Sequence, residues 1–143
     1  MNTRKLTAID VGLLVIRLGL GVMFIMHGWP KMMGGPEKWA GIGGAMGALG
    51  ITFAPAFWGF MAAFAELIGG AMLIVGLLVR PFAAMMFFTM FVAAVMHITG
   101  EHGFYKWAWP VEVGVAFLGL TIAGGGRLAL GATLAPFKDH WFR

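Results

Sequence analysis

Five ionisable residues lie within or at the ends of long apolar segments, where a charge is difficult to accommodate. Arg17 and Glu66 interrupt apolar runs, and His27, His97 and Glu112 lie where such runs begin or end. A charged residue at the centre of a membrane helix costs about 2.5–3.5 kcal/mol on insertion scales, and it normally faces a partner or a water-filled cavity. Histidine exchanges protons near neutral pH, and a carboxylate can pass them on. The five residues are therefore a candidate site for ligand binding or proton exchange, although none can be assigned as catalytic.

Arg17 and Glu66 are predicted to be partners, because both lie near mid-depth if the first two spanning helices are antiparallel. Two interpretations remain open. The pair is either a buried ion pair that fixes the register of the bundle, or a charged anchor for an anionic or quinone-like ligand. On a helix, the face of Glu66 consists almost entirely of small residues, namely Gly59, Ala62, Ala63, Gly69 and Gly70. Small residues let a second backbone approach closely, so Glu66 is predicted to point into a tight helix contact rather than into lipid.

The two histidines are expected at similar depth, because both end helices that run towards the same side of the membrane. Glu112 begins a helix on that side, and Glu101 and His102 lie in the preceding loop. These residues predict a cluster in the outer half of the bundle. The alternative is that the histidines only bond headgroups or loop carbonyls. A methionine precedes each of the two histidines and suits Cu(I), but neighbouring residues on a helix diverge by about 100 degrees, so no metal site is predicted.

A ligand is predicted to bind between the helices below His27 and His97. Glu66 would form the floor of this site and Glu112 its wall. Tryptophans prefer the headgroup region. Three of them are therefore expected to rim the opening: Trp29, Trp107 and Trp109.

The composition predicts an all-α integral membrane protein. The 143 residues are 60% hydrophobic and only 11% charged, whereas soluble domains carry about 25% charged residues. Four apolar segments are near the length that spans a bilayer. They predict a single four-helix transmembrane domain with helices at about 9–27, 54–79, 81–98 and 105–123, and a glycine-rich interfacial loop at 33–52. The chain lacks cysteine, which excludes thiol chemistry by its own side chains, and its scattered net charge of +4 excludes nucleic acid as a partner.

Basic residues indicate the orientation of the helices in the membrane. The first apolar segment is too long for a signal sequence and is taken as a retained helix. The two halves of the chain share an arginine–histidine–glutamate order, which suggests two helix-hairpin repeats, although the arginine-to-histidine spacing differs. Both termini are predicted to be cytoplasmic, because one side would collect Arg4, Lys5, Arg80, Arg127, Lys138 and Arg143, and the other Lys31, Lys38 and Lys106.

The chain resembles the DoxX family of small four-helix membrane proteins. The resemblance runs from about Leu14 to Leu130 and is strongest in Arg17–Lys31 (RLGLGVMFIMHGWPK) and Glu66–Pro81 (ELIGGAMLIVGLLVRP). Outside these two blocks, His97, Glu112 and the Gly124–Arg127 segment also match. The family often has serine and aspartate after this glycine–arginine, where this chain has Ala129 and Gly131.

The resemblance implies an integral protein of the bacterial cytoplasmic (inner) membrane. It also implies a subunit of a redox system linked to thiosulfate:quinone oxidoreduction, with quinone as the implied cofactor and a redox subunit as the implied partner beside the lipid bilayer. The alternative is a non-catalytic membrane module, either a scaffold or a binder of lipid or a small solute. The substrate, the partner and the oligomeric state are not predicted.

Overall fold

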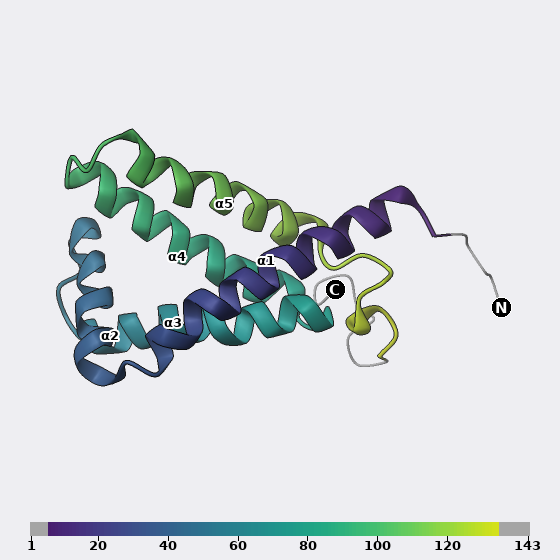
Figure 1. Cartoon of the computed structure of the whole chain (residues 1–143), viewed down its shortest axis with the longest axis horizontal. Helices are drawn as coiled ribbons and strands as arrows, with labels where there is room; N and C mark the ends of the chain where they lie inside the picture. The colour runs from purple at the N-terminus through teal and green to yellow at the C-terminus, as the bar shows by residue number, and fades with distance from the viewer. Residues whose placement is uncertain (1–5, 135–143) are drawn as a thin grey trace.

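The computed structural model describes residues 6–134, and these residues are helical with no β-strand. Figure 1 shows the long helices side by side, with a short helix lying across one end of the bundle. The elements in chain order are α1 (Ala8–Met32), α2 (Gly35–Gly43), the 3-10 helix η1 (Gly44–Leu49), α3 (Pro55–Val75), α4 (Val79–Thr99), α5 (Phe104–Ala123) and the 3-10 helix η2 (Leu130–Ala132).

Three of these helices, α1, α3 and α4, are long and apolar enough to cross a membrane. Helix α5 has 20 residues but is not among the three candidates in the described part of the chain. The expected all-helical membrane fold is therefore confirmed, whereas the four-span count, the internal repeat and the orientation remain predictions. Four of the basic residues that predict the orientation lie outside the described residues, namely Arg4, Lys5, Lys138 and Arg143.

Several predicted helix boundaries were wrong, for identifiable reasons. Helix α1 continues through Pro30 to Met32 instead of ending near residue 27. Helix α3 ends at Val75 rather than at residue 79, because Gly76 adopts a left-handed backbone with φ 76° and so terminates the helix. Helix α4 then begins at Val79, which places Pro81 in the first turn, where the backbone N–H has no helical partner anyway.

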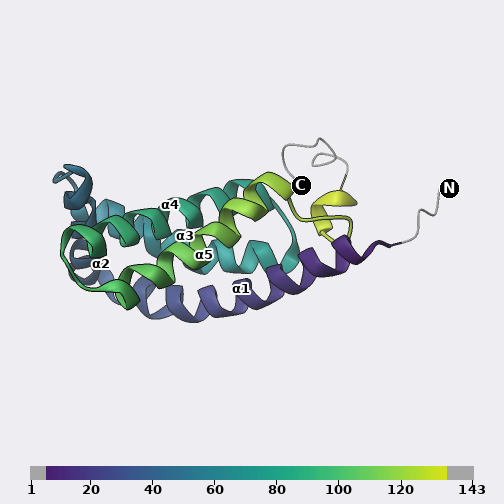
Figure 2. The ribbon, with the colours of Figure 1, turned by 90° about the horizontal axis from the view of Figure 1, so that it is seen from above.

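The segment at 33–52 was predicted as a loop, but most of it is helical. Helix α2 and η1 occupy Gly35–Leu49, and α2 packs against α3 while η1 packs against α4. Glycines make the α2–α3 contact possible. A Cβ added at Gly43 would lie 2.6 Å from the backbone nitrogen of Gly59. The short α2–η1 segment is thus a wall of the bundle, as Figure 2 shows at one end of the long helices.

Small residues also set the register of the antiparallel helices α1 and α3. A Cβ at Gly21 would lie 2.7 Å from the carbonyl oxygen of Gly70. A Cβ at Gly28 would collide with the backbone of Glu66 and Leu67. The tight contact predicted around Glu66 is therefore present, and it fixes which residues of the two helices face each other. The hydrophobic core beside this contact includes Phe24, Leu73, Met86, Phe117 and Leu120.

Candidate ligand-binding cavity

Arg17 is fully buried, but its hydrogen bonds are to backbone carbonyls rather than to Glu66. One guanidinium nitrogen donates to the carbonyl oxygen of Leu73 at 3.3 Å. The other terminal nitrogen donates to the carbonyl oxygen of Leu128 at 3.2 Å. Leu73 lies in the last turn of α3, where carbonyls lack helical partners and the helix dipole favours a cation. Arg17 thus caps α3 and holds the segment that follows α5.

The predicted Arg17–Glu66 pair is therefore wrong, and the helix register explains why. Gly28 of α1 faces Glu66, whereas Gly21 faces Gly70, so Arg17 lies further towards the C-terminal end of α3. Its acceptor Leu73 is seven residues beyond Glu66, which corresponds to about 10 Å along a helix.

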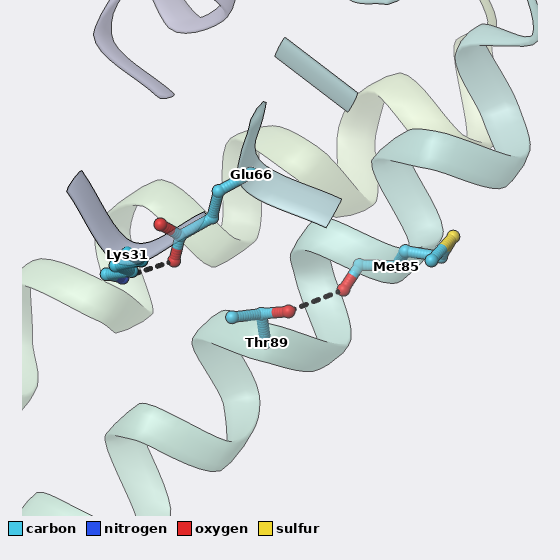
Figure 3. Close-up of polar contacts among 4 residues, drawn as sticks. All are labelled: Lys31, Glu66, Met85 and Thr89. Carbon is cyan, nitrogen blue, oxygen red and sulfur yellow. Dashed lines mark hydrogen bonds and ion pairs between the residues drawn. The ribbon is translucent and has the colours of Figure 1, made fainter. Parts of the chain in front are cut away.

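Glu66 instead forms an ion pair with Lys31. The Lys31 Nζ donates to Glu66 Oε1 at 2.6 Å. The Glu66 side chain is 1% exposed, while that of Lys31 is 31% exposed. Figure 3 shows the pair beside the turn of α4 that carries Met85 and Thr89, whose hydroxyl donates to the Met85 carbonyl at 3.0 Å. Because α1 continues past Pro30, Lys31 reaches the depth of Glu66.

The Lys31–Glu66 pair lies in the wall of a cavity of about 1020 Å³. The cavity is bounded by α2–η1, α3 and α4, at the end of the bundle opposite the start of α1. Its wall is mainly apolar. Its lining includes Lys31, Trp58, Ala62, Glu66, His97 and Trp109.

Two buried polar atoms of residues that line this cavity have no hydrogen-bond partner among the described residues. They are the second carboxylate oxygen of Glu66, Oε2, and the indole nitrogen of Trp58, Nε1, and both are buried. A buried polar group without a partner costs about 1–3 kcal/mol, so such groups are rare in native proteins. Here both belong to residues that line one cavity, and one atom is an acceptor while the other is a donor.

Comparison with known protein families identifies the chain. The DoxX family model matches residues 12–99, which is more than half of the 143 residues. The chain belongs to the DoxX family. Together with the three apolar helices, this makes it an integral membrane protein associated with the lipid bilayer. No curated protein and no solved structure matches it.

The family match ends before α5, although the resemblance was expected to extend to Leu130. It covers Lys31, Trp58, Glu66 and His97, and so nearly all of the cavity. Glu112 and the Gly124–Arg127 segment lie outside it. In this DoxX protein the cavity therefore lies almost entirely within the matched region, with Trp109 beyond it.

The structure brings together only two of the five predicted site residues. Glu66 and His97 line the cavity, whereas Arg17, His27 and Glu112 do not. His27 lies on the outside of α1 with its ring centroid 5.6 Å from that of Trp109. Glu112 lies on the exposed face of α5. The expected cluster of three histidines and two carboxylates is thus not assembled as predicted.

His97 contacts His102, which lies five residues later in the sequence. The Nδ1 atoms of His97 and His102 are 2.9 Å apart, so one ring donates and the other accepts. His102 is exposed, and His97 lines the cavity. The pair connects the cavity to the end of the bundle formed by the α4–α5 turn.

Sequence reasoning missed three residues that the structure shows to be important. Lys31 was read as a marker of orientation, because α1 was expected to end before it. Trp58 was counted with the apolar residues. Asp10 received no role, yet its Oδ2 accepts from the backbone and hydroxyl of Thr7 at 3.0 and 2.7 Å, and its Oδ1 accepts from the backbone nitrogen of Arg127 at 3.1 Å. The Thr-x-x-Asp spacing is a helix N-cap signal that could have identified it.

Proposed function

We propose that this DoxX protein is a membrane subunit of a redox system that binds a lipid-soluble quinone in the cavity between α2–η1, α3 and α4. The observation that carries the proposal is the buried Glu66. One of its carboxylate oxygens is paired with Lys31 and the other lacks a partner, in the wall of a large apolar cavity.

The size and lining of the cavity suit such a molecule. Ligand sites are mostly apolar clefts of about 300–1,000 Å³ with a few polar groups that fix orientation, and this cavity of about 1020 Å³ lies at the upper end. Its apolar wall would hold the isoprenoid tail, while Lys31, Trp58 and Glu66 would contact the oxygens of the ring.

The chemistry assigned to this chain is binding and proton exchange. Reduction of a quinone takes up two electrons and two protons, and we assign the electrons to a partner protein. A carboxyl group within hydrogen-bond reach of the reacting oxygen can deliver or remove a proton. The His97–His102 contact extends from an exposed residue to the cavity wall and would carry protons between the cavity and the aqueous phase.

A non-catalytic module that binds lipid or supports a partner is the second candidate. The predominantly apolar wall favours it, because a lipid tail would pack there equally well. In this case Lys31 and Glu66 would only hold α1 and α3 together. Mass spectrometry of small molecules extracted with the purified protein separates the two candidates, since the lipid module would carry phospholipid and no quinone.

Binding of decylubiquinone to the purified protein in nanodiscs, measured by calorimetry, tests the main proposal. Ala62→Trp fills the cavity and should weaken binding at least tenfold. Val115→Trp adds the same side chain on the exposed face of α5, outside the cavity, and should leave binding unchanged. Equal binding by wild type and Ala62→Trp, or no binding by wild type, would contradict the proposal.

A further inference from the structure

The unpartnered atoms of the two cavity-lining residues Trp58 and Glu66 differ in what they require of a ligand. An ionised carboxylate only accepts hydrogen bonds, and an indole N–H only donates them. Glu66 forms an ion pair with the Lys31 ammonium at 2.6 Å. Its free oxygen therefore needs a donor, and neither carbonyl of a quinone ring is one.

From this we infer that the cavity is selective for a ligand with a hydroxyl on its head group, so that it holds the reduced quinol more tightly than the quinone. This inference rests on the proposed function and names the form of the ligand that the same site prefers. The quinol hydroxyl would donate to Glu66 Oε2 and satisfy the acceptor that the protein leaves without a partner.

The other polar groups of the wall do not oppose this preference. Trp58 lies two helical turns before Glu66 on α3, about 12 Å along the axis, and its N–H can donate to an oxygen of either form. The remaining N–H groups of Lys31 are donors too, and an oxygen of quinone or quinol accepts from them equally. Only Glu66 distinguishes a hydroxyl from a carbonyl.

A preference for quinol has a consequence for the direction of electron flow. Tighter binding of the reduced form raises the midpoint potential of the bound couple, by about 30 mV for each tenfold preference in a two-electron couple. The site would thereby favour quinone reduction by the partner.

Three probes with the same tail test the inference: decylubiquinone, decylubiquinol and the dimethyl ether of decylubiquinol. The ether keeps the ring and both oxygens but has no hydroxyl. Affinities are measured by anaerobic calorimetry in nanodiscs. A hydrogen bond to a charged group is strong enough to predict at least a tenfold tighter binding of the quinol than of the quinone or the ether.

Glu66→Gln provides a second measurement. The amide oxygen would pair with Lys31, leaving the NH₂ group, a donor, in the place of Oε2. Because the oxygen of either form accepts from this NH₂ group, the preference for the quinol should then disappear. Glu112→Gln removes a carboxylate from the exposed face of α5 and should keep the wild-type order.

The outcomes separate the inference from the proposed function. Equal affinity for quinone and quinol, or quinol and ether, would overturn the inference and leave quinone binding intact. No binding of any of the three probes would overturn both. The comparison of the three probes uses the unmodified protein, so the test stands even if Glu66→Gln does not fold.

Discussion

The partner of Glu66 can be decided by two double-mutant cycles. The first combines Lys31→Met with Glu66→Gln, and the second combines Arg17→Met with Glu66→Gln. In the structure, Lys31 pairs with Glu66 at 2.6 Å, whereas Arg17 donates to the carbonyls of Leu73 and Leu128. Energetic coupling is therefore expected in the first cycle alone.

The magnitudes follow from burial. Lys31→Met leaves the carboxylate of Glu66, which is 1% exposed, without its cation, and this costs about 3–5 kcal/mol of unfolding free energy. Glu66→Gln should cost less, about 1–2 kcal/mol, because the 31% exposed Lys31 side chain can turn its ammonium to water and the amide oxygen still accepts a hydrogen bond. The double variant should be about 1–3 kcal/mol more stable than the two single losses predict.

Arg17→Met should destabilise the protein by about 3 kcal/mol or more, since it removes two charge-assisted hydrogen bonds. The stability lost in Arg17→Met should add to the stability lost in Glu66→Gln within about 0.5 kcal/mol. Unfolding is followed by circular dichroism in mixed micelles of dodecylmaltoside and SDS. Coupling of Glu66 to Arg17, or its absence with Lys31, would refute the assignment of partners.

Three further predictions concern packing, capping and topology. Gly28→Ala places a Cβ against the α3 backbone and should destabilise by about 1–3 kcal/mol, while Gly12→Ala, with nothing within 4 Å, should be neutral or stabilising in the same micelle assay. Asp10→Asn weakens the N-cap of α1 and its link to the segment after α5, so a loss of about 1 kcal/mol is expected. Single cysteines at Thr3 and Gly103 should react with an impermeant maleimide from opposite sides of intact membrane vesicles. Labelling from one side would contradict the predicted orientation.

Much of the fold was predictable because its signals are local. Long apolar segments and scarce charge predict membrane helices, and the small face around Glu66 predicted a close helix contact that the structure confirms. The errors arose where one residue overrides an apolar run. Gly76, at φ 76°, ends α3 inside a continuous run of apolar residues. Pro30 does not end α1 although proline usually interrupts helices.

The site was harder to predict because it depends on register between helices distant in sequence. Equal depth was assumed for Arg17 and Glu66, but a glycine-mediated contact places Gly28 opposite Glu66. Lys31, which lies fourteen residues or about four helical turns after Arg17, therefore pairs with Glu66 in its place. The role of Trp58 could not be predicted at all, because only packing decides whether an indole N–H finds a partner.

The buried charges divide the bundle into two ends with different roles. At one end, Arg17 and Asp10 join α1 to the end of α3 and to the segment after α5. Arg17 Nε has no hydrogen-bond partner within residues 6–134, but Arg17 is not among the residues that line the cavity. At the other end, the unpartnered atoms of Trp58 and Glu66 belong to residues in the cavity wall. Substitutions at the first end should therefore change stability with little effect on ligand affinity, whereas Trp58→Phe should weaken binding of quinone and quinol alike.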